Sequence, residues 1–220
     1  MEQEIMVKRQ IIFFVAIILF VLWPWKMALG QGFGGGLKGG LAASEVSGDN
    51  LGGPDKLGWF AAVFTNTALG DITRIQLELM YIQKGSRSTP DEKNNFYDYR
   101  FALQYVEIPF LLIVDFPWGG GGRFADRLSL ETGLSAAFLV GSEEMENDRM
   151  LDLSEEKPFH GAELNLLLGF YYPVTSQLNF HLRFSQGITP LRPHEGGTSV
   201  WYNRGQYNTA WTFGISWNLL

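Results

Sequence analysis

From about residue 31 onward, apolar side chains alternate residue by residue with small or polar ones. In residues 128–140 the even positions are mostly apolar, whereas the odd positions are mostly Ser, Glu, Gly and Ala. Successive side chains of a β-strand point to opposite faces, so a period of two predicts strands with one apolar and one polar face. No stretch of useful length has the 3.6-residue period of an amphipathic helix.

This alternation predicts eight strands and an all-β fold. The strands are expected at residues 32–43, 56–66, 74–85, 101–116, 128–140, 162–172, 178–188 and 210–219. Their connections alternate in length, with long ones such as 142–158 and 190–208 and short ones such as 67–73 and 173–177. This arrangement is typical of an up-and-down antiparallel barrel that has long loops at one end and short turns at the other.

The alternation leaves open which face of the sheet points inward. An apolar interior would make a soluble, lipocalin-like carrier, whereas an apolar exterior would make a transmembrane barrel. The polar face favours the membrane, because it is rich in Ser, Gly, Ala, Thr and Asn, which fit inside a narrow barrel. Glycine alone makes up 26 of 220 residues, above the usual share of about 7%.

Charged residues on the polar face support the same choice. Glu78, Glu107, Glu131 and Glu163 share this face with Arg183. A buried charge without a partner is costly, so these residues predict a compensated ionic network inside the barrel.

Bulky aromatic residues gather near both ends of the predicted strands, as in the two girdles of a transmembrane barrel. Those near the long loops are Trp59, Tyr81, Phe138 and Trp211, and those near the short turns are Phe116, Trp118, Tyr172, Phe180 and Trp217. The sequence therefore predicts a transmembrane barrel, with long extracellular loops and short periplasmic turns.

Residues 1–30 have the pattern of a secretory signal peptide. Lys8 and Arg9 precede thirteen apolar residues at 11–23, and Ala28-Leu29-Gly30 supplies small residues before a cleavage site. A membrane-spanning helix is the alternative, but it needs about 20 apolar residues. We expect cleavage after Gly30 and a barrel over residues 31–220. Translation from Met6 would give a more basic start than translation from Met1.

Two segments resemble the PorT-like family of outer-membrane β-barrel proteins. Residues 76–85 read QLELMYIQKG and residues 105–112 read YVEIPFLL, which are similar to the third and fourth strands of that family. The segments GGLKGGLAAS at 35–44 and Glu131-x-Gly133 fit less specifically, and Leu77 stands where the family usually has Pro. The resemblance implies an eight-stranded barrel in the outer membrane of a Gram-negative cell.

The C-terminus resembles the insertion signal of outer-membrane barrels. The pattern Thr212-x-Gly214-x-x-Trp217-x-Leu219 is similar to that signal, although the chain ends on Leu220 instead of an aromatic residue. The resemblance implies assembly by the barrel-assembly machinery. It also allows an envelope or protein-secretion partner.

Patterns that carry chemistry are weak in this sequence. Gly34-x-Gly36-x-x-Gly39 matches a dinucleotide fingerprint but lacks a strand before it and a helix after it. The histidines, His160, His181 and His194, are too dispersed for an evident metal site. His181 shares a face with Arg183 and Ser185, a set that suggests either a lipid hydrolase or an interior polar network, and the network is favoured.

Composition excludes further classes. The absence of cysteine excludes disulfides, thiolate metal sites, a lipoprotein anchor and a cysteine nucleophile. The net charge of −6 argues against a nucleic-acid surface. The acidic segment 142–158 is expected to be a solvated loop, because its spacing does not fit an EF-hand. Several loop aromatics are candidates for a binding surface: Phe96, Tyr97, Tyr99, Trp201 and Tyr202.

These observations predict a non-enzymatic outer-membrane barrel with no catalytic, cofactor-binding or metal-binding residues. Eight strands leave room for packed side chains but not for a wide aqueous channel. The protein would then act through its loops or through envelope partners, with a possible link to protein secretion. The alternatives are a narrow channel, a lipid-modifying enzyme and, less favoured, a soluble carrier.

Overall fold

The computed structural model describes residues 32–48, 53–88, 90, 92, 96, 98–115, 127–147, 149–150, 159–192 and 205–219. The predicted signal peptide lies outside these residues, so it stays a prediction. Within the described part of the chain, no helix is long and apolar enough to cross a membrane.

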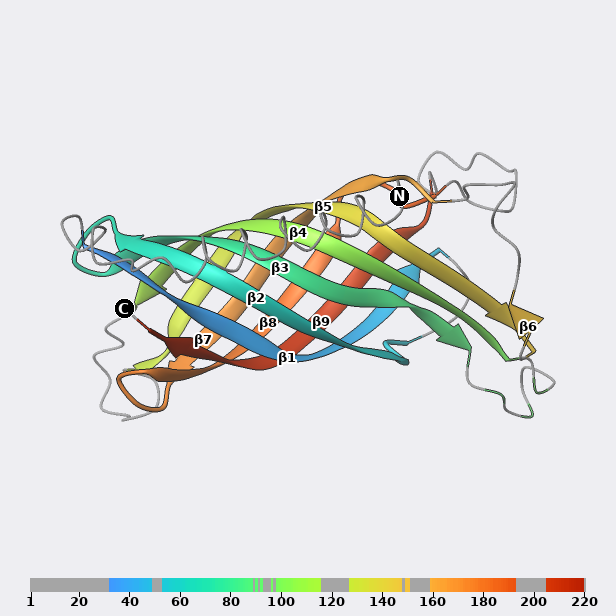
Figure 1. Ribbon diagram of the computed structural model, residues 1–220, viewed down its shortest axis with the longest axis horizontal. Coiled ribbons are helices and arrows are strands. Elements are labelled where there is room, and N and C mark those ends of the chain that lie inside the picture. The colour runs from blue at the N-terminus through green and yellow to red at the C-terminus, as the bar shows by residue number, and fades with distance from the viewer. Residues whose placement is uncertain are drawn as a thin grey trace, which may run out of the picture. The chain divides into compact units, whose positions relative to one another are not determined.

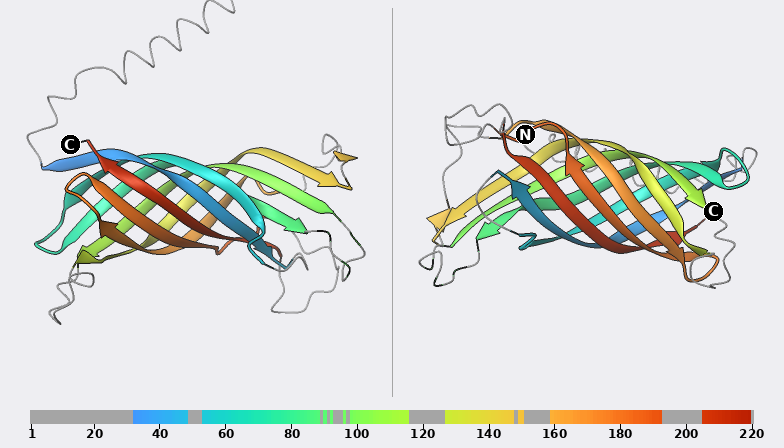
Figure 2. Two further views of the ribbon diagram at one scale, coloured as in Figure 1. Left: turned by 90° about the horizontal axis from the view of Figure 1, so that it is seen from below. Right: turned by 180° about the vertical axis from the view of Figure 1, so that it is seen from behind.

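Eight long strands and one short strand form a single antiparallel sheet (Figure 1). They are β1 (Phe33–Ser47), β2 (Lys56–Ala68), β3 (Thr73–Ser88), β4 (Tyr99–Asp115), β5 (Ser129–Glu146), β6 (Arg149–Met150), β7 (Ala162–Pro173), β8 (Leu178–Gly187) and β9 (Tyr207–Asn218). Each long strand pairs with the next one along the chain, and β1 pairs with β9. The sheet therefore closes into the predicted eight-stranded up-and-down barrel, and Figure 2 shows the closure from two further sides.

The strands extend further toward the long loops than the alternation predicted. β1 continues to Ser47, β3 to Ser88 and β5 to Glu146. In β5 the register with β4 shifts, since Tyr105 pairs with Leu139 whereas Gln104 pairs with Gly141.

This β-bulge leaves Val140 without a partner in β4 and exchanges the two faces of β5 beyond it. Glu144 is consequently buried, although it has the same parity as the exposed Phe138. The prediction that residues 142–158 form a loop is wrong for residues 142–146, which belong to β5, and for residues 149–150, which form β6. An alternation in sequence cannot be followed through a bulge, because the extra residue reverses it.

The apolar face points outward, as predicted for a membrane barrel. The outward side chains of Leu41, Leu134 and Phe213 are each more than half exposed, whereas the polar face is buried. Trp59, Phe138 and Trp211 are exposed toward the loop end, and Phe180 and Trp217 toward the turn end. Phe116 and Trp118 lie outside the described residues. The soluble-carrier alternative required the opposite orientation of the two faces.

Glycines on the inner wall make room for large side chains in the lumen. Gly214 of β9 pairs with Gly40 of β1. A Cβ atom on Gly214 would overlap the carbonyl oxygen of Gly39 and lie 2.7 Å from Cζ of Phe60 and 2.8 Å from Nε2 of His181. The absence of a side chain here therefore lets two rings lie against the barrel wall.

Gly85 lies on the outward face of β3 and tests a second role of glycine, the close approach of two backbones. Its φ is +138°, and an added Cβ atom would overlap the carbonyl oxygen of Phe101. We expect Gly85→Ala to lower the free energy of unfolding by about 1–3 kcal/mol, because strained backbone and overlap with a fixed carbonyl both penalise alanine. Urea unfolding in detergent micelles measures this change. Gly70→Ala is the control, since nothing lies within 4 Å of its added Cβ, and an equal loss in both variants would contradict the prediction.

Candidate functional site

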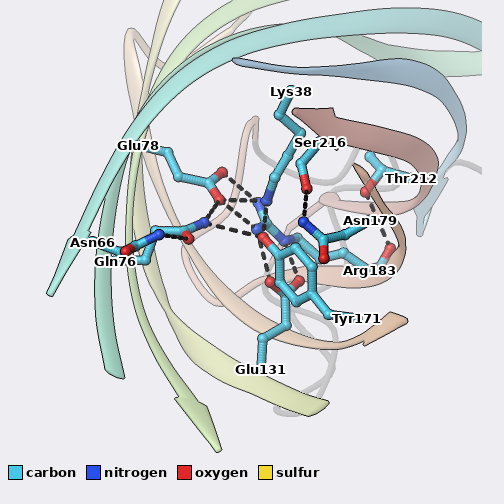
Figure 3. A network of polar contacts seen from close by, with 10 residues as sticks. All are labelled: Lys38, Asn66, Gln76, Glu78, Glu131, Tyr171, Asn179, Arg183, Thr212 and Ser216. Atoms are coloured by element: carbon cyan, nitrogen blue, oxygen red, sulfur yellow. Dashed lines mark hydrogen bonds and ion pairs between the residues drawn. The ribbon is translucent and has the colours of Figure 1, made fainter. Parts of the chain in front are cut away.

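The lower half of the lumen, toward the short turns, contains a buried cluster centred on Arg183 (Figure 3). Arg183 of β8 donates to both oxygens of Glu78 on β3 at 2.9 Å. It also donates to both oxygens of Glu131 on β5, at 2.6 and 3.0 Å. Its guanidinium group thus bridges two carboxylates from different walls of the barrel, in the bidentate geometry that suits arginine.

A second cation completes this lower cluster. Lys38 of β1 donates to Glu78 at 2.5 Å and contacts the Tyr171 hydroxyl. Gln76 donates to Glu78 at 2.7 Å and to the Tyr171 hydroxyl at 3.0 Å. Two cations therefore face two carboxylates, all of them at most 4% exposed. The balance of charge and hydrogen bonds makes their burial tolerable.

A second buried cluster lies toward the long loops. Lys84 of β3 forms ion pairs with Glu107 of β4 at 2.5 Å and with Glu163 of β7 at 3.1 Å. Asn208 of β9 donates to Glu163 at 2.7 Å and to the Tyr105 hydroxyl at 3.2 Å. Apolar side chains surround the ions, including Ile82, Phe101 and Leu103, each at most 1% exposed. This upper cluster also joins opposite walls.

The loop end of the lumen contains a third set of buried contacts. The guanidinium carbon of Arg192 lies 5.1 Å from the ring centroids of both Phe101 and Phe159. Arg192 pairs with Glu144 at 3.6 Å and donates to Gln206 at 2.6 Å. Arg192, which follows β8, therefore lies against two aromatic rings at the loop end of the lumen.

The turn end of the lumen holds a small polar hollow of about 100 Å³. Asn66, Arg74 and Asn179 are among its lining residues, and so are Tyr171 and Gln76, which belong to the lower cluster. Water occupies about 30 Å³ per molecule in the liquid, so the hollow holds only a few waters. The hollow therefore borders the lower cluster at the turn end of the lumen.

The five charged residues predicted for the lumen are all buried in these clusters: Glu78, Glu107, Glu131, Glu163 and Arg183. Lys38 and Lys84, which supply the remaining cations, were not among the residues predicted for the lumen. The sequence contains a signal for both lysines, because each lies at an even-numbered position on the polar face of its strand. Lys84 alternates in step with Glu78 on β3, and Lys38 alternates in step with Gly36 and Gly40 on β1. The choice of partners, however, is not visible in the alternation.

His181 and Ser185 are both buried in the lumen but do not form a catalytic pair. His181 packs against the rings of Phe60 and Tyr171, with centroids 5.3 and 5.8 Å away. Neither its ring nitrogens nor the Ser185 hydroxyl has a hydrogen-bond partner among the described residues. Four residues along one strand separate their backbones by about 13 Å, too far for a base to activate a nucleophile.

The remaining sequence candidates are not brought together by the fold. His160 contacts the carbonyl of Pro190 near the loop end, and His194 lies outside the described residues. Among the residues that can be described, no three His, Asp, Glu or Cys side chains are placed to hold a metal ion. The glycines of the dinucleotide-like pattern lie within β1, with no helix after them.

Of the loop aromatics, two lie in the described part of the chain. Phe96 is 66% exposed beyond the end of β3. Tyr99 belongs to β4, and its hydroxyl donates to Glu144 at the barrel mouth. Tyr97, Trp201 and Tyr202 lie outside the described residues. Of the two loop aromatics that the structure describes, Phe96 has the exposure expected of a binding surface.

Comparisons with known proteins agree with a barrel of the outer membrane. A family model described as "Outer membrane protein beta-barrel domain" matches residues 28–192, which contain β1 to β8. No curated protein matches the sequence.

Several solved structures are similar to this chain. Ail, the attachment invasion locus protein of Yersinia pestis, is 11% identical, with 86% of this chain and 99% of that chain covered and a TM-score of 0.45. Neisserial surface protein A is 11% identical, with 85% and 97% covered and a TM-score of 0.47. OprG from Pseudomonas aeruginosa is 10% identical, with 86% and 96% covered and a TM-score of 0.40.

Proposed function

Because the chain belongs to the outer membrane protein beta-barrel domain family and lies in the bacterial outer membrane, we propose that it is a non-enzymatic barrel with a closed lumen. Its work is then done outside the lumen, by the extracellular loops or by contacts with other envelope proteins. The lipid bilayer is its surrounding medium, and its rigid interior serves to hold the loops in place.

The observation that carries this proposal is the bridging of the lumen by Arg183. Its bonds to Glu78 and Glu131 connect three strands through the barrel interior. The Lys84 cluster and the contacts of Arg192 lie further along the same axis toward the loops. A solute would have to break three successive sets of buried polar contacts to cross, and the desolvated ions would resist this strongly.

Conductance measurements test the closed lumen. The purified mature protein, inserted into planar bilayers, is expected to give no stable conductance steps at either polarity. Its insertion is checked by protease protection and by the heat-dependent shift of the folded barrel on gels, and a wide porin serves as the positive control. Recurrent unitary steps from the inserted protein would support the narrow-channel alternative instead.

We further infer that the chain is a PorT-like member of its family. The QLELMYIQKG and YVEIPFLL segments support this assignment, and in the fold they lie in the adjacent strands β3 and β4. Removal of residues 1–30, insertion by the barrel-assembly machinery and an envelope or secretion partner belong to the same proposal. N-terminal sequencing of the mature protein tests the cleavage after Gly30. In-cell crosslinking with co-purification tests the partners, and recovery of the barrel alone would contradict a role in a larger assembly.

A further inference from the structure

Two arginines stand directly opposite each other on the outer wall of the barrel. Arg87 of β3 pairs with Arg100 of β4 in the antiparallel register, and both side chains are exposed. Like charges at directly opposed positions destabilise a sheet. Within the described part of the chain, neither arginine forms an ion pair, and Arg100 contacts only the sulfur of Met145, at 2.9 Å. Among the residues that the structure describes, the pair therefore has no carboxylate within ion-pair distance.

The pair lies at the loop-side border of an uncharged stretch of the outer wall. Between the turn end and these arginines, the outward face of β3 and β4 has no charged side chain; its residues are Ile75, Leu77, Leu79, Tyr81, Gln83, Gly85, Ala102, Gln104, Val106, Ile108, Phe110, Leu112 and Val114. On the neighbouring strand β2, the outward side chain of Leu57 is 71% exposed. The next residue is Gly58, where an added Cβ atom would overlap the carbonyl oxygen of Gln83. Arg87 and Arg100 are thus the first charges met where the lipid-facing wall of β3 and β4 leaves the apolar zone. The pair lies six positions beyond Tyr81 and Val106, on the side of the long loops and the outer-leaflet surface.

The surroundings of the pair add positive charge and a hollow. Lys56, at the start of β2, lies within electrostatic range of both arginines and of Glu143. Arg87, Arg100, Asp98 and Met145 line a hollow of about 90 Å³. Asp98 is one of the lining residues of this hollow, and Glu143 interacts electrostatically with Lys56. Neither carboxylate lies within ion-pair distance of the arginines.

We propose that Arg87 and Arg100 bind a phosphate group of an outer-leaflet lipid. A guanidinium group is planar, always charged and matched to phosphate oxygens, which makes opposed arginines a suitable clamp for such an anion. The phosphate would supply the missing counter-charge and convert a repulsive cross-strand pair into a stabilised one. The lipid would hold the loop end of β3 and β4 at a fixed depth in the membrane.

The test compares lipid retention by the full mature barrel in nanodiscs. The discs contain phosphatidylcholine with either diphosphoryl lipid A or its dephosphorylated form, and native mass spectrometry counts the lipids that stay bound. We expect wild type to retain the phosphorylated lipid preferentially. The Arg87→Gln/Arg100→Gln variant is expected to lose this preference by about tenfold or more, since each basic side chain at a membrane surface contributes roughly 1 kcal/mol.

The matched control is Arg127→Gln/Arg149→Gln, which removes two other exposed arginines and the same total charge. It is expected to retain the phosphorylated lipid as wild type does. The thermal unfolding midpoint of each variant confirms that the barrel is folded. Equal retention by the two double variants would overturn the proposal, as would equal retention of the dephosphorylated lipid. A stabilisation of wild type by inorganic phosphate equal to that by lipid A would instead assign the site to a free anion and would also overturn it.

Discussion

Replacing Arg183 with glutamine is expected to lower the free energy of unfolding by about 3–5 kcal/mol, the usual cost of removing one partner of a buried ion pair. The substitution removes four hydrogen bonds to Glu78 and Glu131. It also leaves two buried carboxylates with Lys38 as their only cation in the lower cluster. Urea unfolding of the barrel in lipid vesicles, followed by tryptophan fluorescence, measures the loss.

Two controls separate charge imbalance from the loss of packing. Arg183→Gln combined with Glu131→Gln removes one charge of each sign and leaves the Lys38–Glu78 pair intact. This double variant is expected to recover at least half of the lost stability. Arg74→Gln breaks the half-exposed pair with Asp115 and is expected to cost less than about 1 kcal/mol. If the Arg183 variant were as stable as wild type, the lower cluster would contribute nothing to holding the barrel together.

An arginine introduced at Leu166 on the outer wall is expected to destabilise the barrel by about 2–4 kcal/mol in a bilayer. Leu166 lies near the middle of β7, is 49% exposed and pairs with Leu134 of β5 on the same apolar face. The cost arises because the charged group would have to enter the hydrocarbon region. Unfolding in lipid vesicles measures it.

The control for this experiment is Leu69→Arg. Leu69 is 67% exposed but lies in the short turn after β2, where a charge is expected to cost at most about 1 kcal/mol. A depth-dependent difference between the two variants reports on the bilayer directly. Equal and small effects at both positions would mean that water, not lipid, surrounds the middle of β7.

The sequence was informative where structure depends on neighbouring residues. The period of two located all eight long strands. The alternate positions that hold small residues identified the inner face, because a strand's side chains alternate regardless of its surroundings. The predicted end of the fifth strand at Val140 was wrong. Val140 has no partner in β4, the two faces of β5 are exchanged beyond it, and the strand continues to Glu146. The bulge arises from pairing with β4, which local periodicity does not contain.

For the candidate site, too, the sequence indicated which charges are buried but not which partners they have. The parity of Glu78, Glu131 and Arg183 indicated that their charges would be buried together, since isolated buried charges are costly. It could not indicate that Arg183 reaches Glu78 across 105 positions of sequence, nor that Lys84 pairs with Glu163 on the opposite side of the lumen. Such partners depend on the stagger at which the sheet closes.

The same distinction applies to the outer wall. Arg87 and Arg100 each appear in sequence as a single charge near a strand end, and only the β3–β4 register makes them a facing pair. By itself the sequence determined the strands, their two faces, and which face meets lipid and which meets the lumen, because these follow from the order of side chains along one strand. The tertiary structure decided the ion partners, the contacts that cross the lumen and the arginine pair, because these depend on the register between strands, which is fixed only when the barrel closes.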